Sequence, residues 1–376
     1  MEERPVAVFG GGGFIGSHLV RRLVEEGREV VVVDITREKL ADVLPHDRIE
    51  FIEADVGDPG NDQVNRRVVE DSGLVIDLIA YANPQQYVDM PLEVVELNYD
   101  QNLKIVEDCV ETDTRLIQFS TSEVYGKLGG RTGEDVVFRE DESDLVMGPV
   151  GNHRWIYATA KQLLERMVNA HGIENGLDWT IVRPFNFIGQ EMDYIITDPD
   201  EGTPRVFAGF MSALLYDHPM NVVDGGENRR AFTYIEDAID AIELIIENPD
   251  GHFSNEVVNI GTPGNETTMM DLAHLMRDVY QELSPDGSLP PLNTPSGEEF
   301  YGEGYEDCER RVPDIGKLEA VGWEPEYDLR EMLEETMAYY VEEHEKEVEA
   351  DEEETGEDEE ETGEDEEERA TEQRVR

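Results

Sequence analysis

Three short segments of this 376-residue chain carry side chains that could do chemistry. A glycine-rich turn occupies residues 10–16, a Ser-Thr-Ser-Glu segment occupies 120–123, and a tyrosine and a lysine stand four residues apart at 157 and 161. The turn is of a kind that binds a dinucleotide, and a tyrosine beside a lysine can move a proton. Together the segments indicate hydride transfer to or from a sugar-like alcohol.

The glycine turn lies between an apolar run typical of a buried strand and an amphipathic segment typical of a helix, the context in which this motif binds phosphates. Gly10 permits the tight turn, Gly13 lets the backbone approach a pyrophosphate, and Gly16 lets the helix pack against the strand. The first N–H groups of the helix, around Phe14 and Ile15, then face the phosphates.

Two carboxylates extend this predicted cofactor site. Asp34 ends the second apolar run, 18 residues after Gly16, where it can accept hydrogen bonds from the adenine ribose hydroxyls. It would repel a 2′-phosphate, which predicts NAD rather than NADP. Asp55 follows the third apolar run and either reaches the adenine or closes a turn.

Tyr157 and Lys161 share one face of a predicted helix, since residues four apart are neighbours on a helix surface. The ammonium and a positive nicotinamide ring both favour the phenolate of Tyr157, which can then act as a base near neutral pH. Lys161 would also hold the nicotinamide ribose. Only six residues of the chain are lysine, so an accidental match to this motif is rarer than usual.

The Ser-Thr-Ser-Glu segment follows the fifth apolar run, at the edge where parallel sheets bind ligands. A hydroxyl of Ser120, Thr121 or Ser122 can hydrogen-bond the reacting oxygen of a sugar. Glu123 either takes part in the reaction, since burying an unpaired carboxylate is costly, or is a carboxylate at a helix start.

Several arginines could grip a diphosphate or a carboxylate through the planar guanidinium fork, or could serve as surface ion-pair partners in so acidic a chain. The candidates are Arg154, Arg205, Arg230 and Arg311, and composition alone does not separate Arg311 from Arg310.

Apolar runs alternate with helical patterns, notably at 91–110 and 154–170. This alternation predicts an α/β protein with a doubly wound parallel sheet, the NAD(P)-binding Rossmann fold. Two later runs, at 232–235 and 257–260, are expected to rejoin the sheet.

The predicted NAD-binding domain comprises residues 1–185 and about 231–261. A smaller mixed C-terminal lobe, about 186–230 and 262–340, is expected to supply substrate contacts. Because its two parts are separated in sequence, this lobe is not an independent domain.

The chain is strongly acidic, with a net charge of −59, of which −16 falls in residues 342–376. This tail repeats Asp-Glu-Glu-Glu-Thr-Gly-Glu without an apolar position, so we expect it to be disordered. The remaining −43, with six Lys against 24 Arg, suits a cytoplasm filled with molar salt, where the Debye length is about 3 Å. A halophile protein is the hypothesis, and an ordinary acidic enzyme is the alternative.

The same charge argues against nucleic acid or an anionic membrane as partner, because phosphate contacts need basic patches. Cys109 and Cys308 make neither a disulfide framework nor a metal set, so no metal is expected. No apolar stretch approaches the ~20 residues of a membrane span, and the first strand leaves no room for a signal peptide. We therefore expect a cytoplasmic protein.

The chain resembles the extended short-chain dehydrogenase/reductases of the NAD-dependent epimerase/dehydratase family that act on nucleotide sugars. Within this family it is most similar to the UDP-glucuronate decarboxylase domain of the bifunctional 4-amino-arabinose pathway enzyme and to UDP-apiose/UDP-xylose synthase. The resemblance covers roughly residues 4–340. It rests on Ser-Thr-Ser-Glu-Val-Tyr-Gly (120–126), Arg-Pro-Phe-Asn (183–186), Val-Asp-Gly-Gly (223–226) and Tyr-Gly-Glu-Gly-Tyr-Glu-Asp (301–307).

The resemblance implies that NAD oxidises C4 of UDP-glucuronate and that CO₂ is then lost, giving UDP-4-keto-pentose or UDP-xylose. It assigns the C4 proton to Tyr157, help at that oxygen to Thr121 or Ser122, and decarboxylation to Glu123 and Arg311. The positions that match nucleotide-sugar contacts are Arg154, Asn186, Arg205, Arg230 and Tyr305. It also implies a homodimer, because helices matching 91–110 and 154–170 pair between subunits in this family.

Two departures from the family pattern limit these expectations. The apiose-forming relatives carry cysteines at the position of Ser122 and near Ala82, which argues against ring contraction to apiose here. Asn221 stands where the bacterial domain has a nucleotide-contacting lysine. The alternatives are a nucleotide-sugar 4-epimerase or 4,6-dehydratase and, more distantly, a binding protein that senses NAD.

Overall fold

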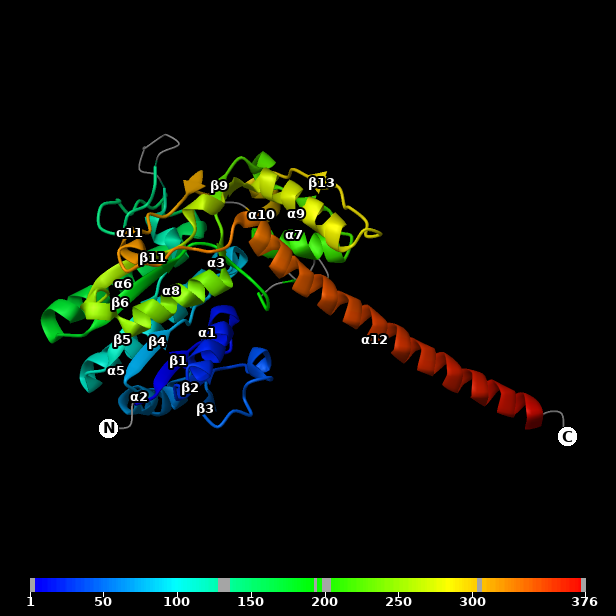
Figure 1. Cartoon of the computed structure of the whole chain (residues 1–376), viewed down its shortest axis with the longest axis horizontal. Helices are drawn as coiled ribbons and strands as arrows, with labels where there is room; N and C mark the ends of the chain where they lie inside the picture. Colours follow the sequence, from blue (N-terminus) through cyan, green and yellow to red (C-terminus); the bar gives the residue numbers. More distant parts are fainter. Residues whose placement is uncertain (1–3, 128–135, 193–194, 198–203, 303–305, 373–376) are drawn as a thin grey trace.

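The computed structural model describes residues 4–127, 136–192, 195–197, 204–302 and 306–372, with side chains as far as Ala350. A seven-stranded sheet lies between layers of helices (Figure 1). Its strands, all paired in parallel, are in order β11 (Glu256–Ile260), β6 (Trp179–Pro184), β5 (Arg115–Phe119), β4 (Leu74–Asp77), β1 (Val6–Phe9), β2 (Val30–Asp34) and β3 (Ile49–Glu53). The chain order reverses between β1 and β4, so the predicted doubly wound Rossmann fold is confirmed.

The helices cover both faces of this sheet. α1 (Phe14–Glu25) and α8 (Ile235–Glu247) contact each other on one face, and the other face carries α2 (Asp62–Asp71), α5 (Asn102–Thr112) and α6 (Ile156–Asn175). Side chains of β1 alternate between two buried clusters, with Val6 and Val8 in the first and Ala7 and Phe9 in the second. This alternation is what a strand buried on both faces requires.

The two predicted helices are present with local irregularities. The segment predicted at 91–110 is built from α4 (Pro91–Val95), a π-helical turn (Glu96–Gln101) and α5, after a short α3 (Pro84–Asp89). The segment predicted at 154–170 begins as a 3₁₀ turn (His153–Trp155) and continues as α6.

One predicted strand is wrong. The run at 257–260 joins the sheet as β11, but the run at 232–235 does not. Instead β10 (Thr233–Tyr234) pairs with β7 (Phe187–Ile188) in a separate two-stranded sheet. The chain enters α8 at Ile235, so only two residues remain extended, too few to add a strand to the main sheet.

The second lobe is made of short elements beside the carboxyl ends of the strands. Its helices are α7 (Val206–Leu215), α9 (Met269–Leu283) and α10 (Gly297–Tyr301), and α11 (Gly316–Glu319) packs beside β11. Its strands are β8 (Met220–Asn221) with β13 (Leu292–Asn293), and β9 (Arg229–Ala231) between β12 (Glu266–Thr268) and β14 (Arg310–Arg311). Phe207 of α7 and Leu272 of α9 belong to the same buried cluster as Val6 of β1, so the two lobes share one core.

The final helix, α12 (Leu329–Glu372), packs through Met332, Leu333 and Met337 against the lobe and then projects from the body (Figure 1). In this structure the backbone is helical as far as Glu372, which glutamate, a good helix former, favours. The disorder expected of the tail beyond residue 341 stays a prediction. Among the described residues, none of the helices has the length and apolar character that crossing a membrane requires.

Candidate active site

The glycine turn joins β1 to α1 as predicted, and its glycines are needed for different reasons. Gly10 has φ of +80°, and a Cβ on Gly16 would lie 2.3 Å from the Gly10 carbonyl oxygen. A Cβ on Gly13 would meet nothing closer than 3.5 Å, and its φ of −79° suits any residue. The fold itself therefore does not require glycine at position 13, whereas a phosphate approaching the uncapped N-terminus of α1 would.

Asp34 is held at the end of β2 by the same turn. Its carboxylate accepts hydrogen bonds from the backbone N–H of Gly12 at 2.8 Å and of Thr36 at 3.1 Å. A Cβ on Gly12 would lie 2.1 Å from the Thr36 carbonyl oxygen, a requirement that the sequence analysis missed. The residues of the turn thus fit a dinucleotide, with Asp34 placed for a ribose and its charge unfavourable to a 2′-phosphate.

Asp55 closes a turn in this structure. It is exposed, and its side chain accepts a hydrogen bond from the N–H of Gly57 at 2.7 Å. Of the two alternatives for this residue, the turn is the one observed, and contact with the adenine stays a prediction.

Tyr157 and Lys161 lie in the first turns of α6, where both side chains are buried. The Lys161 Nζ donates to the carbonyl oxygens of Phe119, at 3.1 Å, and Ile79, at 3.4 Å. Burial lowers the pKa of Lys161 to about 8, against the raising effect of Asp77 and Glu165. The ammonium is therefore charged at neutral pH and is lost as the pH rises through about 8.

The phenol of Tyr157 behaves differently from our expectation of a ready phenolate. Burial, followed by the charge of Glu123, raises the pKa of Tyr157, while a hydrogen bond with Thr121 lowers it. Arg205 and Arg154 also lower this pKa, but burial prevails, so the protein alone keeps Tyr157 protonated at neutral pH. The ring also stacks on Tyr87, with centroids 4.9 Å apart, a contact that the sequence analysis missed.

The hydroxyl segment stands directly after β5. The Thr121 hydroxyl oxygen accepts a hydrogen bond from the N–H of Glu123 at 3.1 Å and so caps the 3₁₀ turn Ser122–Tyr125. The hydroxyl hydrogen of Thr121 remains available for the hydrogen bond with Tyr157. The hydroxyl of Ser120 is buried and has no hydrogen-bond partner within the described ranges. All three hydroxyl residues line the cavity described below.

Glu123 lies in the first turn of the Ser122–Tyr125 3₁₀ helix, and its carboxylate is an ion-pair partner. Arg154 grips it with two guanidinium nitrogens, and Nη1 of Arg311 lies 3.7 Å from the same carboxylate. Burial would raise the pKa of Glu123, but Arg154 and then Arg311 lower it, so the group is ionised at neutral pH. The helix-start position is therefore observed as well, and the carboxylate at that position is engaged by arginines.

The register of the small sheet separates the arginines that composition could not. Parallel pairing of β14 with β9 sets Arg311 beside Arg230 and Arg310 beside Arg229. Because successive side chains of a strand point to opposite faces, one pair lines the cavity and the other turns away. Arg310 and Arg229 both bind Glu266, whereas Nε and Nη2 of Arg311 are buried without a hydrogen-bond partner among the residues described.

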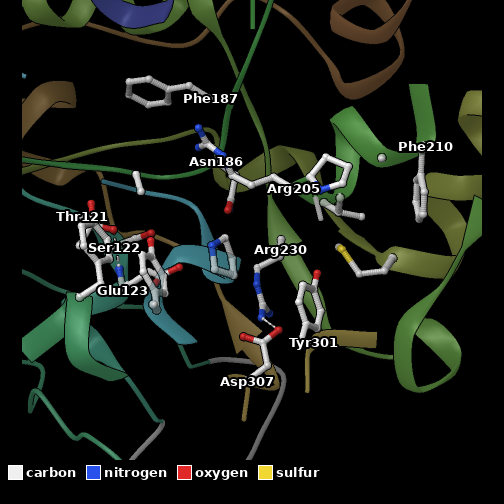
Figure 2. Close-up of a pocket in the computed structure, with 18 of the residues that line it drawn as sticks. Thr121, Ser122, Glu123, Asn186, Phe187, Arg205, Phe210, Arg230, Tyr301 and Asp307 are labelled. Atoms are coloured by element: carbon white, nitrogen blue, oxygen red, sulfur yellow. Dashed lines mark hydrogen bonds and ion pairs between the residues drawn. The ribbon is translucent and has the colours of Figure 1, made fainter. Parts of the chain in front are cut away.

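The far wall of the cavity is also charged (Figure 2). Nη2 of Arg230 donates to Asp307 at 2.6 Å. Burial would raise the pKa of Asp307, but Arg230, Arg154 and Arg311 together hold it below its usual value. Tyr301 lies beside this pair, and Arg205 enters from the start of α7 with a buried, unpaired Nε among the described contacts.

These groups surround one cavity of about 860 Å³. Of the predicted site residues, it brings together Gly10, Gly13, Phe14, Ile15, Gly16, Thr121, Ser122, Glu123, Arg154, Tyr157, Asn186, Arg205, Arg230 and Arg311. Asp34, Asp55 and Lys161 do not line it, and Tyr305 lies outside the described residues. The sequence analysis did not select Tyr301 and Asp307, although they are the first and last residues of the Tyr-Gly-Glu-Gly-Tyr-Glu-Asp motif. No sequence signal marked Tyr87.

A sheet of this order, a phosphate-fitting glycine turn and a buried tyrosine–lysine pair are the features of a dinucleotide-binding enzyme of the Rossmann type. The chain belongs to the NAD dependent epimerase/dehydratase family, whose model matches residues 6–261. As a member, it is an enzyme that uses NAD, as predicted.

Three of the proteins similar to this one match it over most of the chain. The UDP-D-apiose/UDP-D-xylose synthase of Oryza sativa subsp. japonica is 42% identical over 358 residues, which cover 89% of this chain and 88% of the rice protein. UDP-D-apiose/UDP-D-xylose synthase 1 of Arabidopsis thaliana is 41% identical, with 89% and 90% covered. The crystal structure of PbgP3 protein from Burkholderia pseudomallei is similar with a TM-score of 0.76 and 34% identity, over 90% of this chain and 96% of that one.

The two glycines of the turn generate a paired prediction. Gly13→Ala should weaken NAD binding at least about tenfold, or ~1.4 kcal/mol, because the new methyl group occupies the approach to the phosphates. Gly16→Ala should instead lower the Tm of the protein without NAD, because its methyl group meets the Gly10 carbonyl. Calorimetric titration with NAD and thermal unfolding separate the two effects. Unchanged NAD affinity in Gly13→Ala would contradict the assigned role.

Proposed function

We propose that this enzyme oxidises UDP-glucuronate at C4 and then decarboxylates it, releasing UDP-4-keto-pentose or, after re-reduction, UDP-xylose. The observation that carries the proposal is Arg311, which is buried beside Glu123 with donors that have no partner among the described residues. A second carboxylate, that of a uronate, would satisfy these donors. The relatives that share 41–42% identity support a related decarboxylating activity.

The side chains around the cavity suit the first half of this reaction. Bound NAD would supply the hydride acceptor. Tyr157 would take the proton of the C4 hydroxyl while the C4 hydrogen leaves as hydride, and Thr121 or Ser122 would hold the same oxygen. Lys161 would hold the nicotinamide ribose, with its charge stabilising the phenolate.

The charged wall suits the second half. Loss of CO₂ breaks the bond between C5 and the carboxylate carbon, and the electron pair is delocalised into the C4 ketone as an enolate. The substrate carboxylate would compete with Glu123 for Arg154 and Arg311, which raises the pKa of Glu123 because a like charge approaches it. Glu123 could then carry the proton that C5 requires.

The remaining arginines suit the diphosphate. Arg205 and Arg230 approach the cavity from α7 and β9, and Asn186 stands between β6 and β7 with φ of +43°. Arginine is the side chain best matched to phosphate because its planar fork makes paired hydrogen bonds. A neutral Asn221 at the cavity wall leaves the diphosphate charge to these two arginines. Ring contraction to apiose is not proposed, since Ser122 replaces a cysteine.

The test is the mass of the product formed from UDP-glucuronate and NAD. We expect loss of CO₂, with NADH accumulating if the ketopentose is released and without NADH if it is re-reduced. Arg311→Ala should lower the rate of decarboxylation by about 10² or more, since it removes a side chain that holds the substrate carboxylate in position for its loss. Arg310→Ala is the matched control, because it is adjacent but points to Glu266. An unchanged substrate mass would overturn the proposal.

Two other functions predict different outcomes of that experiment. A nucleotide-sugar 4-epimerase or 4,6-dehydratase shares the C4 oxidation but has no need of Arg311, so Arg311→Ala would stay largely active. A protein that only senses NAD would bind the sugar nucleotide and change the spectrum of bound NAD without turnover. The intact Tyr157 and Lys161 favour an active enzyme.

We also propose a cytoplasmic homodimer formed through the helices around α6. Leu92 of α4 and Leu163 of α6 are apolar yet exposed, by 82% and 45%, on helices that contact each other. Leu92→Glu with Leu163→Glu should convert a dimer into a monomer in light scattering in molar KCl, because burying two charges is costly. Val150→Glu, at an exposed loop residue, is the control. A monomeric wild type would reject the proposal.

We propose, finally, that the protein is adapted to high salt. The body carries −43 without the tail, and exposed like charges repel each other unless salt screens them. The Tm should therefore rise by several degrees between dilute buffer and molar KCl. A variant ending at Ala350 should keep this dependence, because most of the charge lies in the body. Full stability in dilute buffer with no gain from KCl would refute the hypothesis.

A further inference from the structure

A carboxylate outside the cavity lies at the reactive end of the sheet. Asp77 ends β4 and is fully buried. Its Oδ1 accepts the backbone N–H of Ile79 at 3.0 Å, and its Oδ2 accepts the side-chain amide of Gln118, on β5, at 2.9 Å. Like Asp34, it is a charged residue closing an apolar run, but the sequence analysis passed over it.

Ile79 and Gln118, which donate hydrogen bonds to Asp77, are connected to the two carbonyl groups that accept from Lys161. The carbonyl of Ile79, whose N–H binds Asp77, accepts from Lys161 Nζ at 3.4 Å. The carbonyl of Phe119 accepts from Nζ at 3.1 Å and from the Gln118 amide at 3.4 Å. Asp77 therefore links the ends of β4 and β5, whose carbonyl oxygens accept hydrogen bonds from the Lys161 ammonium.

Asp77 and Lys161 are the main opposite charges that act on each other in this region. Within the described residues, no arginine or lysine lies within ion-pair distance of Asp77, and Lys161 is the cation that acts on it. The other carboxylate that acts on Lys161, Glu165, is engaged by Arg183 at 2.6 and 2.9 Å. A buried charge without such compensation is strongly unfavourable.

We propose that Asp77 is a positioning residue for Lys161, which holds the ends of β4 and β5 in place around the ammonium and keeps that ammonium charged. The proposal rests on the proposed role of Lys161 in holding the cofactor ribose. It applies to any substrate that this cavity accepts, because it concerns the cofactor side of the reaction.

Charge removal can be separated from loss of packing. Asp77→Asn keeps size and shape, and the oxygen of the new amide can still accept the Ile79 N–H. Its NH₂ needs an acceptor, and the amide oxygen of Gln118 is buried without a partner among the described residues. A turn of the Gln118 amide would restore that hydrogen bond and give up the 3.4 Å contact of this amide with the Phe119 carbonyl, so the variant removes the charge while the shape of the site is kept.

The direct measurement is the titration of Lys161 by NMR of lysine labelled at Cε, which is feasible because the chain has six lysines. In the wild type, burial brings the pKa of Lys161 to about 8. Asp77→Asn should lower the midpoint by about one pH unit, since an opposite charge has been removed. Asp237→Asn, at a carboxylate that is also buried but accepts the N–H of Glu326, is the control and should leave the midpoint unchanged.

A second readout follows NAD affinity against pH without any sugar substrate. In Asp77→Asn the affinity should fall about fivefold near pH 8 and little near pH 6, because only the neutral lysine loses its hold on the ribose. Gln118→Met, which keeps the carboxylate but removes one of its donors, should shift both profiles in the same direction by less. If Asp77→Asn does not fold, this variant carries the test. A Lys161 midpoint that neither variant moves would overturn the proposal, whatever the enzyme's substrate.

Discussion

The reactive end of this protein depends on one buried ammonium. Lys161 is 1% exposed, and its charge is held by carbonyl oxygens at the ends of two neighbouring strands. A cation in the interior persists only where oxygens and an opposite charge replace its water. These contacts join α6 to the ends of β4 and β5. Tyr157, one turn earlier on the same helix, is thereby directed into the cavity.

The cavity walls follow the same rule for negative charge. Several arginines gathered in a buried space would repel each other, and Glu123 and Asp307 neutralise part of that charge before any substrate arrives. Under the proposed function, an anionic substrate would exchange with these carboxylates at the guanidinium groups. Such exchange lets a carboxylate change its protonation state with binding, which a fixed surface ion pair cannot do.

The second lobe can supply these arginines because it is not a separate body. Its helices share the core of the sheet, and its three-stranded sheet brings Arg230 and Arg311, 81 positions apart in the chain, into adjacent register. Alternation along β9 and β14 then gives each neighbouring arginine the opposite face, where Glu266 receives Arg229 and Arg310. A shift of one residue in this register would exchange the two pairs.

The sequence by itself determined the features that are local or periodic. Apolar runs alternating with helices specify a doubly wound sheet, the glycine turn announces a dinucleotide, and a four-residue spacing sets Tyr157 and Lys161 on one helix face. Only the tertiary structure decided which arginine faces the cavity, that Glu123 pairs with Arg154, and that Asp77 is buried where its charge acts on Lys161. The tertiary structure also decided that the run at 232–235 lies outside the main sheet. These outcomes depend on the register of paired strands and on which charged side chains are buried together. The spacing of residues along the chain reveals neither of these features.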